Sequence, residues 1–105
     1  MTDILKKLNV ILQDRKNKSP EESYVSSLYE KGLGHACSKI EEETNEFISA
    51  LKNENKERIV SEATDLWFHS LVALSMKNLS SDDILIELEK RFGISGHEEK
   101  SNRST

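Results

Sequence analysis

The chain has 105 residues, of which 32% are charged and 35% hydrophobic, with a formal net charge of −4 and a pI near 5.4. This length and composition are typical of one small globular domain. The acidic balance argues against nucleic acid or an anionic membrane as a partner, because both require a basic surface. No apolar run is long enough to span a membrane and no signal-peptide core is present, so we expect a cytoplasmic protein.

The sequence predicts helices throughout, because it has one proline, four glycines and no sustained alternation of apolar and polar residues. The first helix is expected over about residues 2–13. Ser19-Pro20-Glu21-Glu22 then has the pattern of a helix start, with Ser19 as the N-cap and Glu22 closing a capping box. This short second helix is expected to end near Gly32 or Gly34, either of which can supply a left-handed cap.

A helical hairpin is predicted at the centre of the chain. The third helix spans about residues 35–52, and the fourth runs from a three-residue polar turn to about Met76. Because this turn is short, the two helices should be antiparallel neighbours. A fifth helix, capped by Ser80 or Ser81 and stopped by Gly93, follows with core positions at Ile84, Leu85, Leu88 and Phe92. We assign residues 1–96 to one all-α, four- to five-helix bundle and residues 97–105 to a polar, flexible tail.

Acidic residues line both helices of this hairpin. Glu42 and Glu46 lie on neighbouring turns of one helical face with Glu43 beside them, and Glu62 and Asp65 form a second strip that His69 extends. The fourth helix is otherwise apolar nearly all round, which predicts that it is buried. Buried like charges are costly unless a positive partner joins them, and a divalent cation is the simplest such partner. A chain of this size cannot cover such a helix alone, so we also predict a homodimer.

Each of these features has a plainer interpretation. The glutamates of the third helix are often no more than a solvated face, and His69 is as readily a hydrogen-bonded core residue as a ligand, because magnesium prefers oxygen. Trp67 and Phe68 are expected in the core rather than stacked on a base. The cations near the acids are either surface charges or contacts for an anionic substrate; they are Lys31, Lys39, Arg58 and Arg91.

The acid pattern Glu42-Glu43-x-x-Glu46, followed by Glu62-x-x-Asp65, resembles the signature of the all-α nucleoside triphosphate pyrophosphohydrolases, which include MazG and dimeric dUTPases. Further segments resemble the phosphoribosyl-ATP pyrophosphohydrolases of histidine biosynthesis, over about residues 4–100. They are Ser23-Tyr24-Val25, Lys31-Gly32-Leu33, Lys39-Ile40, Ala63-x-Asp65-Leu66-Trp67-Phe68-His69 and Glu89-x-Arg91-Phe92-Gly93-x-Ser95-Gly96. Glu41 and Thr44 depart from the usual glycine and alanine, but neither change removes an expected ligand.

The resemblance implies a MazG-like, dimeric fold and hydrolysis of 1-(5-phosphoribosyl)-ATP to 1-(5-phosphoribosyl)-AMP and pyrophosphate, with Mg²⁺ required and Mn²⁺ as a substitute. It implies Glu43, Glu46, Glu62 and Asp65 as metal ligands and Glu42 as a ligand or as the base that orients water. Weaker candidates for phosphate contacts are Lys31, Lys39, Arg58 and Arg91. A cyclohydrolase on a separate chain is expected to act next.

Two other functions remain open at this point. One is a house-cleaning pyrophosphatase of the same superfamily that acts on modified nucleotides. The other is a non-catalytic helical module that uses the hairpin as a dimerisation surface. Its acids would tolerate neutral replacement without loss of function, whereas those of a pyrophosphatase would not.

Overall fold

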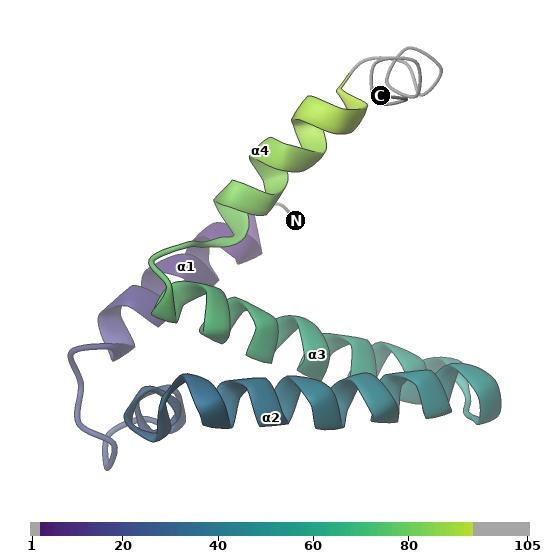
Figure 1. The fold of residues 1–105 in the computed structure, drawn as a ribbon, viewed down its shortest axis with the longest axis horizontal. Helices are drawn as coiled ribbons and strands as arrows, with labels where there is room; N and C mark the ends of the chain where they lie inside the picture. The colour runs from purple at the N-terminus through teal and green to yellow at the C-terminus, as the bar shows by residue number, and fades with distance from the viewer. Residues whose placement is uncertain (1–2, 94–105) are drawn as a thin grey trace.

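The computed structural model describes residues 3–93 and contains four helices in this range: α1 (Asp3–Arg15), α2 (Tyr24–Asn53), α3 (Lys56–Met76) and α4 (Ser81–Phe92). α2 and α3 lie side by side as an antiparallel hairpin, while α1 lies near one end of it and α4 projects away (Figure 1). The predicted all-α fold with a central hairpin is confirmed. No helix among residues 3–93 is long and apolar enough to cross a membrane. The predicted tail at residues 97–105 lies outside the described residues.

A kink at Gly32 divides α2 and marks the boundary between the predicted second and third helices. Gly32 has φ 88° and ψ 179°, whereas the residues around it are helical. This region of backbone space is essentially restricted to glycine. The prediction that a glycine interrupts the chain here is therefore confirmed, but the helices on either side of Gly32 follow one another without a loop.

The predicted start of the second helix at Ser19 is wrong. Ser23 is the N-cap of α2, with its side chain accepting a hydrogen bond from the Ser26 backbone N–H at 3.3 Å. Ser19 belongs instead to a preceding turn, where its carbonyl accepts from the Glu22 N–H at 3.0 Å. The Ser26 hydroxyl donates to the Arg15 carbonyl at 2.8 Å, so the first turn of α2 is held against the end of α1.

The predicted polar turn of the hairpin is present, and the helix ends on both sides of it are capped. The Glu54 N–H donates to the Ala50 carbonyl at 2.9 Å and ends α2. Asn55 caps α3, with its side-chain oxygen accepting from the Arg58 N–H at 3.0 Å. These two caps satisfy backbone groups that helix ends leave unpaired, and they hold α2 and α3 in register.

The apolar core lies where α1 and the first part of α2 meet the C-terminal half of α3. It contains Leu12, Leu28, Leu71 and Val72. The Tyr29 hydroxyl crosses this core, donating to the Leu12 carbonyl at 3.0 Å and lying 2.5 Å from the Ser75 hydroxyl. Because this network ties three helices together, it fixes the half of α3 that follows the acidic residues.

The prediction that the fourth helix is buried nearly all round is wrong for the single chain. Within α3, Val60 is 60% exposed and Trp67 is 64% exposed, so Trp67 is not a core residue here. The expected core positions of α4 are also exposed; they are Ile84, Leu85, Leu88 and Phe92. The physical reason is that α2 covers one face of α3, whereas α4 extends beyond the hairpin (Figure 1).

Candidate active site

The acids of α2 and α3 meet at the interface between the two helices, as the hairpin predicts. Glu43 is only 6% exposed and Glu62 only 4% exposed, although both are ionisable. Glu42 and Glu46 of α2 are exposed at the edge of this interface. Asp65 is also exposed, so the prediction that it turns toward the interior with Glu62 is wrong.

Glu43 faces His69 across the interface. Its Oε1 lies 2.5 Å from His69 Nδ1, and both side chains are buried. His69 Nδ1 also lies 3.1 Å from the Asp65 carbonyl oxygen, and Glu43 Oε1 has its close contact with Nδ1 without a well-formed hydrogen bond. Burial raises the pKa of Glu43, an effect that the nearby His69 opposes and the charge of Asp65 increases.

Glu62 has a different neighbour on each side. The Arg58 guanidinium, one turn earlier on α3, contacts Oε1 of Glu62, whereas Oε2 is buried without a hydrogen-bond partner. Glu46 approaches from α2, and its pKa is raised because its protonated form can donate a hydrogen bond to Glu62. Two carboxyl groups from opposite helices therefore lie close enough to interact, which favours binding of a proton or a cation.

The other predicted cations are spread along the chain. Lys39 Nζ lies 3.5 Å from Glu42 Oε1, and the Glu42 charge raises the pKa of Lys39. Lys31 is exposed next to the Gly32 kink. Arg91 lies on α4, outside the hairpin, where its Nε is 2.9 Å from Glu87 Oε2. The structure thus brings Lys39 and Arg58 to the acids, but not Arg91 of the same chain.

The donor set fits a hard divalent cation. Carboxylate oxygens are the ligands that Mg²⁺ and Mn²⁺ prefer, and one of them, Glu62 Oε2, is buried without a hydrogen-bond partner. Within residues 3–93 no three acidic, histidine or cysteine side chains already converge as a ligand set. Arg58 and His69 contact the buried carboxylates in this arrangement, so the acids would have to turn toward a metal to bind it.

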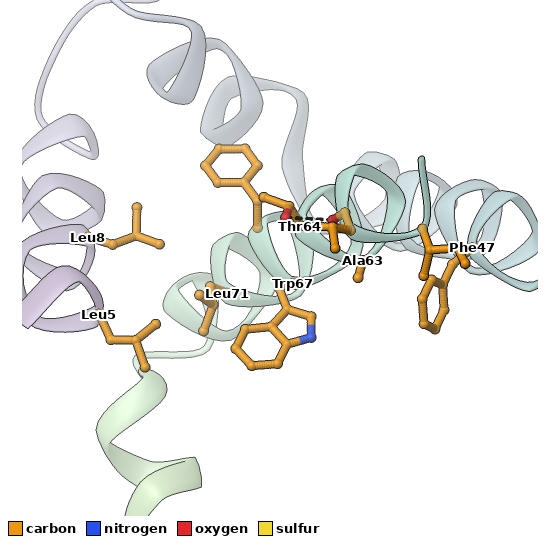
Figure 2. Close-up of a pocket in the computed structure, with 10 residues that line it drawn as sticks. Leu5, Leu8, Phe47, Ala63, Thr64, Trp67 and Leu71 are labelled. Atoms are coloured by element: carbon orange, nitrogen blue, oxygen red, sulfur yellow. Dashed lines mark hydrogen bonds between the residues drawn. The ribbon is translucent and has the colours of Figure 1, made fainter. Parts of the chain in front are cut away.

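A large hollow of about 540 Å³ lies elsewhere, between α1 and α3. Leu5 and Leu8 of α1 lie on one side of it, opposite Trp67 and Leu71 of α3 (Figure 2). Its lining is almost wholly apolar and includes none of the predicted site residues. An apolar surface has no charged or polar groups to bind a triphosphate. We therefore place the chemistry at the acids rather than in this hollow.

The contact between His69 and Glu43 could not be predicted from the sequence. The i, i+4 spacing of Glu42 and Glu46 indicated a common face, but it did not show which glutamate turns toward α3. The available signal was the helical spacing of Glu62, Asp65 and His69, which placed the histidine on the acidic strip. Its pairing with a residue 26 positions earlier depends on the packing of the hairpin.

Comparison with known proteins shows the family to which this chain belongs. The family model described as phosphoribosyl-ATP pyrophosphohydrolase matches residues 5–92. The chain is 55% identical to a phosphoribosyl-ATP pyrophosphatase of Hydrogenovibrio crunogenus, over 97% of this chain and 94% of that protein. It is 47% identical to one of Vesicomyosocius okutanii over 99% of each chain, and 48% identical to one of Methylococcus capsulatus over 96% of each. The chain belongs to the phosphoribosyl-ATP pyrophosphohydrolase family.

Proposed function

We propose that this protein hydrolyses 1-(5-phosphoribosyl)-ATP to 1-(5-phosphoribosyl)-AMP and pyrophosphate, a step of histidine biosynthesis. The observation that carries the proposal is the pair of buried carboxylates, Glu43 on α2 and Glu62 on α3, in a chain of this family. Burying two such groups costs stability, and a bound cation would offset that cost. Relatives that match almost the whole chain are named for this activity.

The proposed metal ligands are Glu43, Glu46, Glu62 and Asp65, with Mg²⁺ as the physiological cation and Mn²⁺ as a substitute. They come from both helices of the hairpin, and Glu46 already meets Glu62 across the interface. When bound, the cation would withdraw charge from the triphosphate and stabilise the departing pyrophosphate. Asp65 and Glu46 are exposed, so they can reach a substrate that arrives from solvent.

Glu42 is the proposed base or an additional ligand. It is exposed next to the buried Glu43, so a water molecule can lie between its carboxylate and the substrate. In the reaction, the water oxygen bonds to phosphorus, the α–β phosphoanhydride bond breaks, and the proton from water passes to a carboxylate. Lys39 and Arg58 are close enough to the acids to contact the phosphates as the acids turn to the cation.

A homodimer accounts for the apolar surface of α3. Val60 and Trp67 lie on the face of the helix opposite Glu62 and His69, and they border the hollow that α1 and α3 form (Figure 2). Large exposed apolar patches on small proteins mark interaction surfaces. We propose that a second copy covers this surface. The cytoplasm is the proposed location, because a phosphorylated nucleotide substrate does not cross membranes unaided.

Substrate selectivity tests this function against general nucleotide clearance. The purified protein would be supplied with phosphoribosyl-ATP, ATP, dUTP and an oxidised nucleotide at equal concentrations with Mg²⁺. We expect kcat/KM for phosphoribosyl-ATP to exceed kcat/KM for each of the other nucleotides by about a hundredfold or more. The reason is that a site with polar groups that bind the additional ribose phosphate discriminates against substrates that lack it. A house-cleaning enzyme would show the opposite ranking.

A further inference from the structure

His69 occupies a buried position between the two acid-bearing helices. It is only 6% exposed, and its two ring nitrogens have different neighbours. Nδ1 lies 2.5 Å from Glu43 Oε1 and 3.1 Å from the Asp65 carbonyl oxygen, whereas Nε2 lies 3.5 Å from the Tyr24 hydroxyl. Magnesium prefers oxygen ligands to imidazole, so His69 needs a role other than that of a ligand.

The neighbours of the ring determine where its proton lies. The carboxylate and the carbonyl near Nδ1 can only accept hydrogen bonds, and a lone pair placed between them would be repelled. Nδ1 therefore carries the hydrogen. Nε2 faces the Tyr24 hydroxyl at 3.5 Å, a distance that makes this the weaker contact.

The ring is also held in place more firmly than the carboxylate it contacts. The Asp65 carbonyl belongs to α3 itself, one turn before His69, so the Nδ1–H bond locks the ring to its own helix. Phe68 packs edge-on against the ring, with centroids 5.1 Å apart. Glu43 reaches this fixed N–H from α2, and a small turn of its carboxylate is enough to share the hydrogen.

We propose that His69 is a positioning residue, whose Nδ1–H holds Glu43 Oε1 and leaves the other carboxylate oxygen for a divalent cation. The inference rests on the proposed function only in taking Glu43 as a ligand. Partners that fix the orientation of metal ligands are generally needed for full metal affinity. Without the hydrogen from His69, Glu43 loses its contact with a fixed N–H on α3, and its carboxylate can turn away.

Two substitutions separate the ring nitrogens. Asparagine carries its amide nitrogen where histidine has Nδ1, whereas glutamine carries it where histidine has Nε2. The measurement is Mn²⁺ affinity of the purified full chain without substrate. We expect His69→Asn to stay within about threefold of the parent Kd and His69→Gln to weaken binding by about tenfold or more. His35→Asn, at a histidine outside the proposed site, is the matched control and should leave the Kd unchanged.

The inference is overturned if His69→Gln binds Mn²⁺ as tightly as His69→Asn, or if both lose affinity equally. Nitrogen NMR of the parent protein gives an independent measurement that needs no variant. A hydrogen on Nδ1 whose resonance shifts on addition of Mg²⁺ supports the inference, and a ring protonated only at Nε2, or an Nδ1–H resonance that does not respond to Mg²⁺, overturns it. The function is judged separately, by whether the parent hydrolyses phosphoribosyl-ATP, because the ranking of the two variants is measured without substrate.

Discussion

Glu46 of α2 and Glu62 of α3 meet across the hairpin, close enough for one carboxyl group to donate a hydrogen bond to the other. This pair requires both helices of the hairpin, because each helix contributes one of the two acids. Adjacent like charges favour binding of a proton in the metal-free protein and of a cation in the working enzyme. The proximity of these two acids thus lowers the stability of the metal-free fold but supports activity.

The stability of the metal-free protein should fall as pH rises above the ordinary glutamate pKa. The pKa values of Glu43 and Glu46 are raised in the folded state, so between 4.5 and the raised values the folded chain binds more protons than the unfolded chain. Under linkage, stability then decreases with increasing pH across this window, and the loss is complete above it. Urea unfolding in chelator at about pH 5 and about pH 8 measures the change.

The combined variant Glu43→Gln, Glu46→Gln is the control for this pH dependence. It keeps the shape of both side chains but removes the two raised pKa values. Its stability should change less with pH over the same window than that of the parent. An equally steep decrease in the variant would show that other groups cause the effect.

Replacing Glu46 by glutamine should separate stability from activity. Removing its charge relieves repulsion with Glu62, so the melting temperature in chelator should be unchanged or higher. Loss of one ligand should reduce kcat by about a hundredfold, equivalent to roughly 3 kcal/mol of transition-state stabilisation. Glu41→Gln, at an exposed neighbouring position on α2, should alter neither quantity. If Glu46→Gln hydrolysed the substrate as fast as the parent, Glu46 would not be a metal ligand.

The kink at Gly32 should be intolerant of a side chain for conformational reasons. Its φ of 88° is rarely adopted by other residues, although a Cβ at this position would meet no atom within 4 Å. Gly32→Ala should therefore reduce the free energy of unfolding by about 1–3 kcal/mol. Gly34→Ala is the matched control, because Gly34 is helical and also has no atom within 4 Å of an added Cβ. Alanine at this position should increase the free energy of unfolding by up to about 1 kcal/mol. Denaturant unfolding of both variants measures these changes. A free energy of unfolding that Gly32→Ala leaves unchanged would contradict this account.

A charge at the centre of the exposed α3 face should prevent dimerisation. Trp67 is 64% exposed in the single chain, and burial of its ring by a second copy would be favourable. Trp67→Glu should yield monomers at micromolar concentration in light scattering, whereas the parent should be a dimer. Lys77→Glu, at an exposed position just beyond α3, introduces the same acidic side chain away from this face and should remain dimeric. A monomeric parent would contradict the proposed assembly.

Most of the helical architecture could be predicted because it depends on local chemistry. The polar turn before α3 and the serine cap of α4 are signals within a few residues, and both are confirmed: Asn55 precedes α3 as its N-cap and Ser80 caps α4. The start of α2 could not be predicted in the same way. Ser19 has the better local pattern, but Ser26 at the true helix start bonds to the Arg15 carbonyl, a contact that depends on how α1 packs.

The candidate site could be predicted in composition but not in arrangement. The spacing of the acids placed two ridges face to face, and Glu62 is buried there as expected. The burial of Glu43, the exposure of Asp65 and the contact of His69 with Glu43 depend on the rotation of each helix about its axis. Periodicity does not fix that rotation, because residues such as Val60 and Trp67 made α3 look apolar on nearly every side other than the acidic strip.

The most direct test of the central claim is pyrophosphate release from phosphoribosyl-ATP by the purified protein, with Mg²⁺ and again in excess chelator. The account predicts steady release of one pyrophosphate for each 1-(5-phosphoribosyl)-AMP formed when Mg²⁺ is present. It also predicts that chelator stops the reaction without unfolding the protein, because the carboxylate site is not part of the apolar core. Undiminished release in chelator, or release of orthophosphate in place of pyrophosphate, would contradict it.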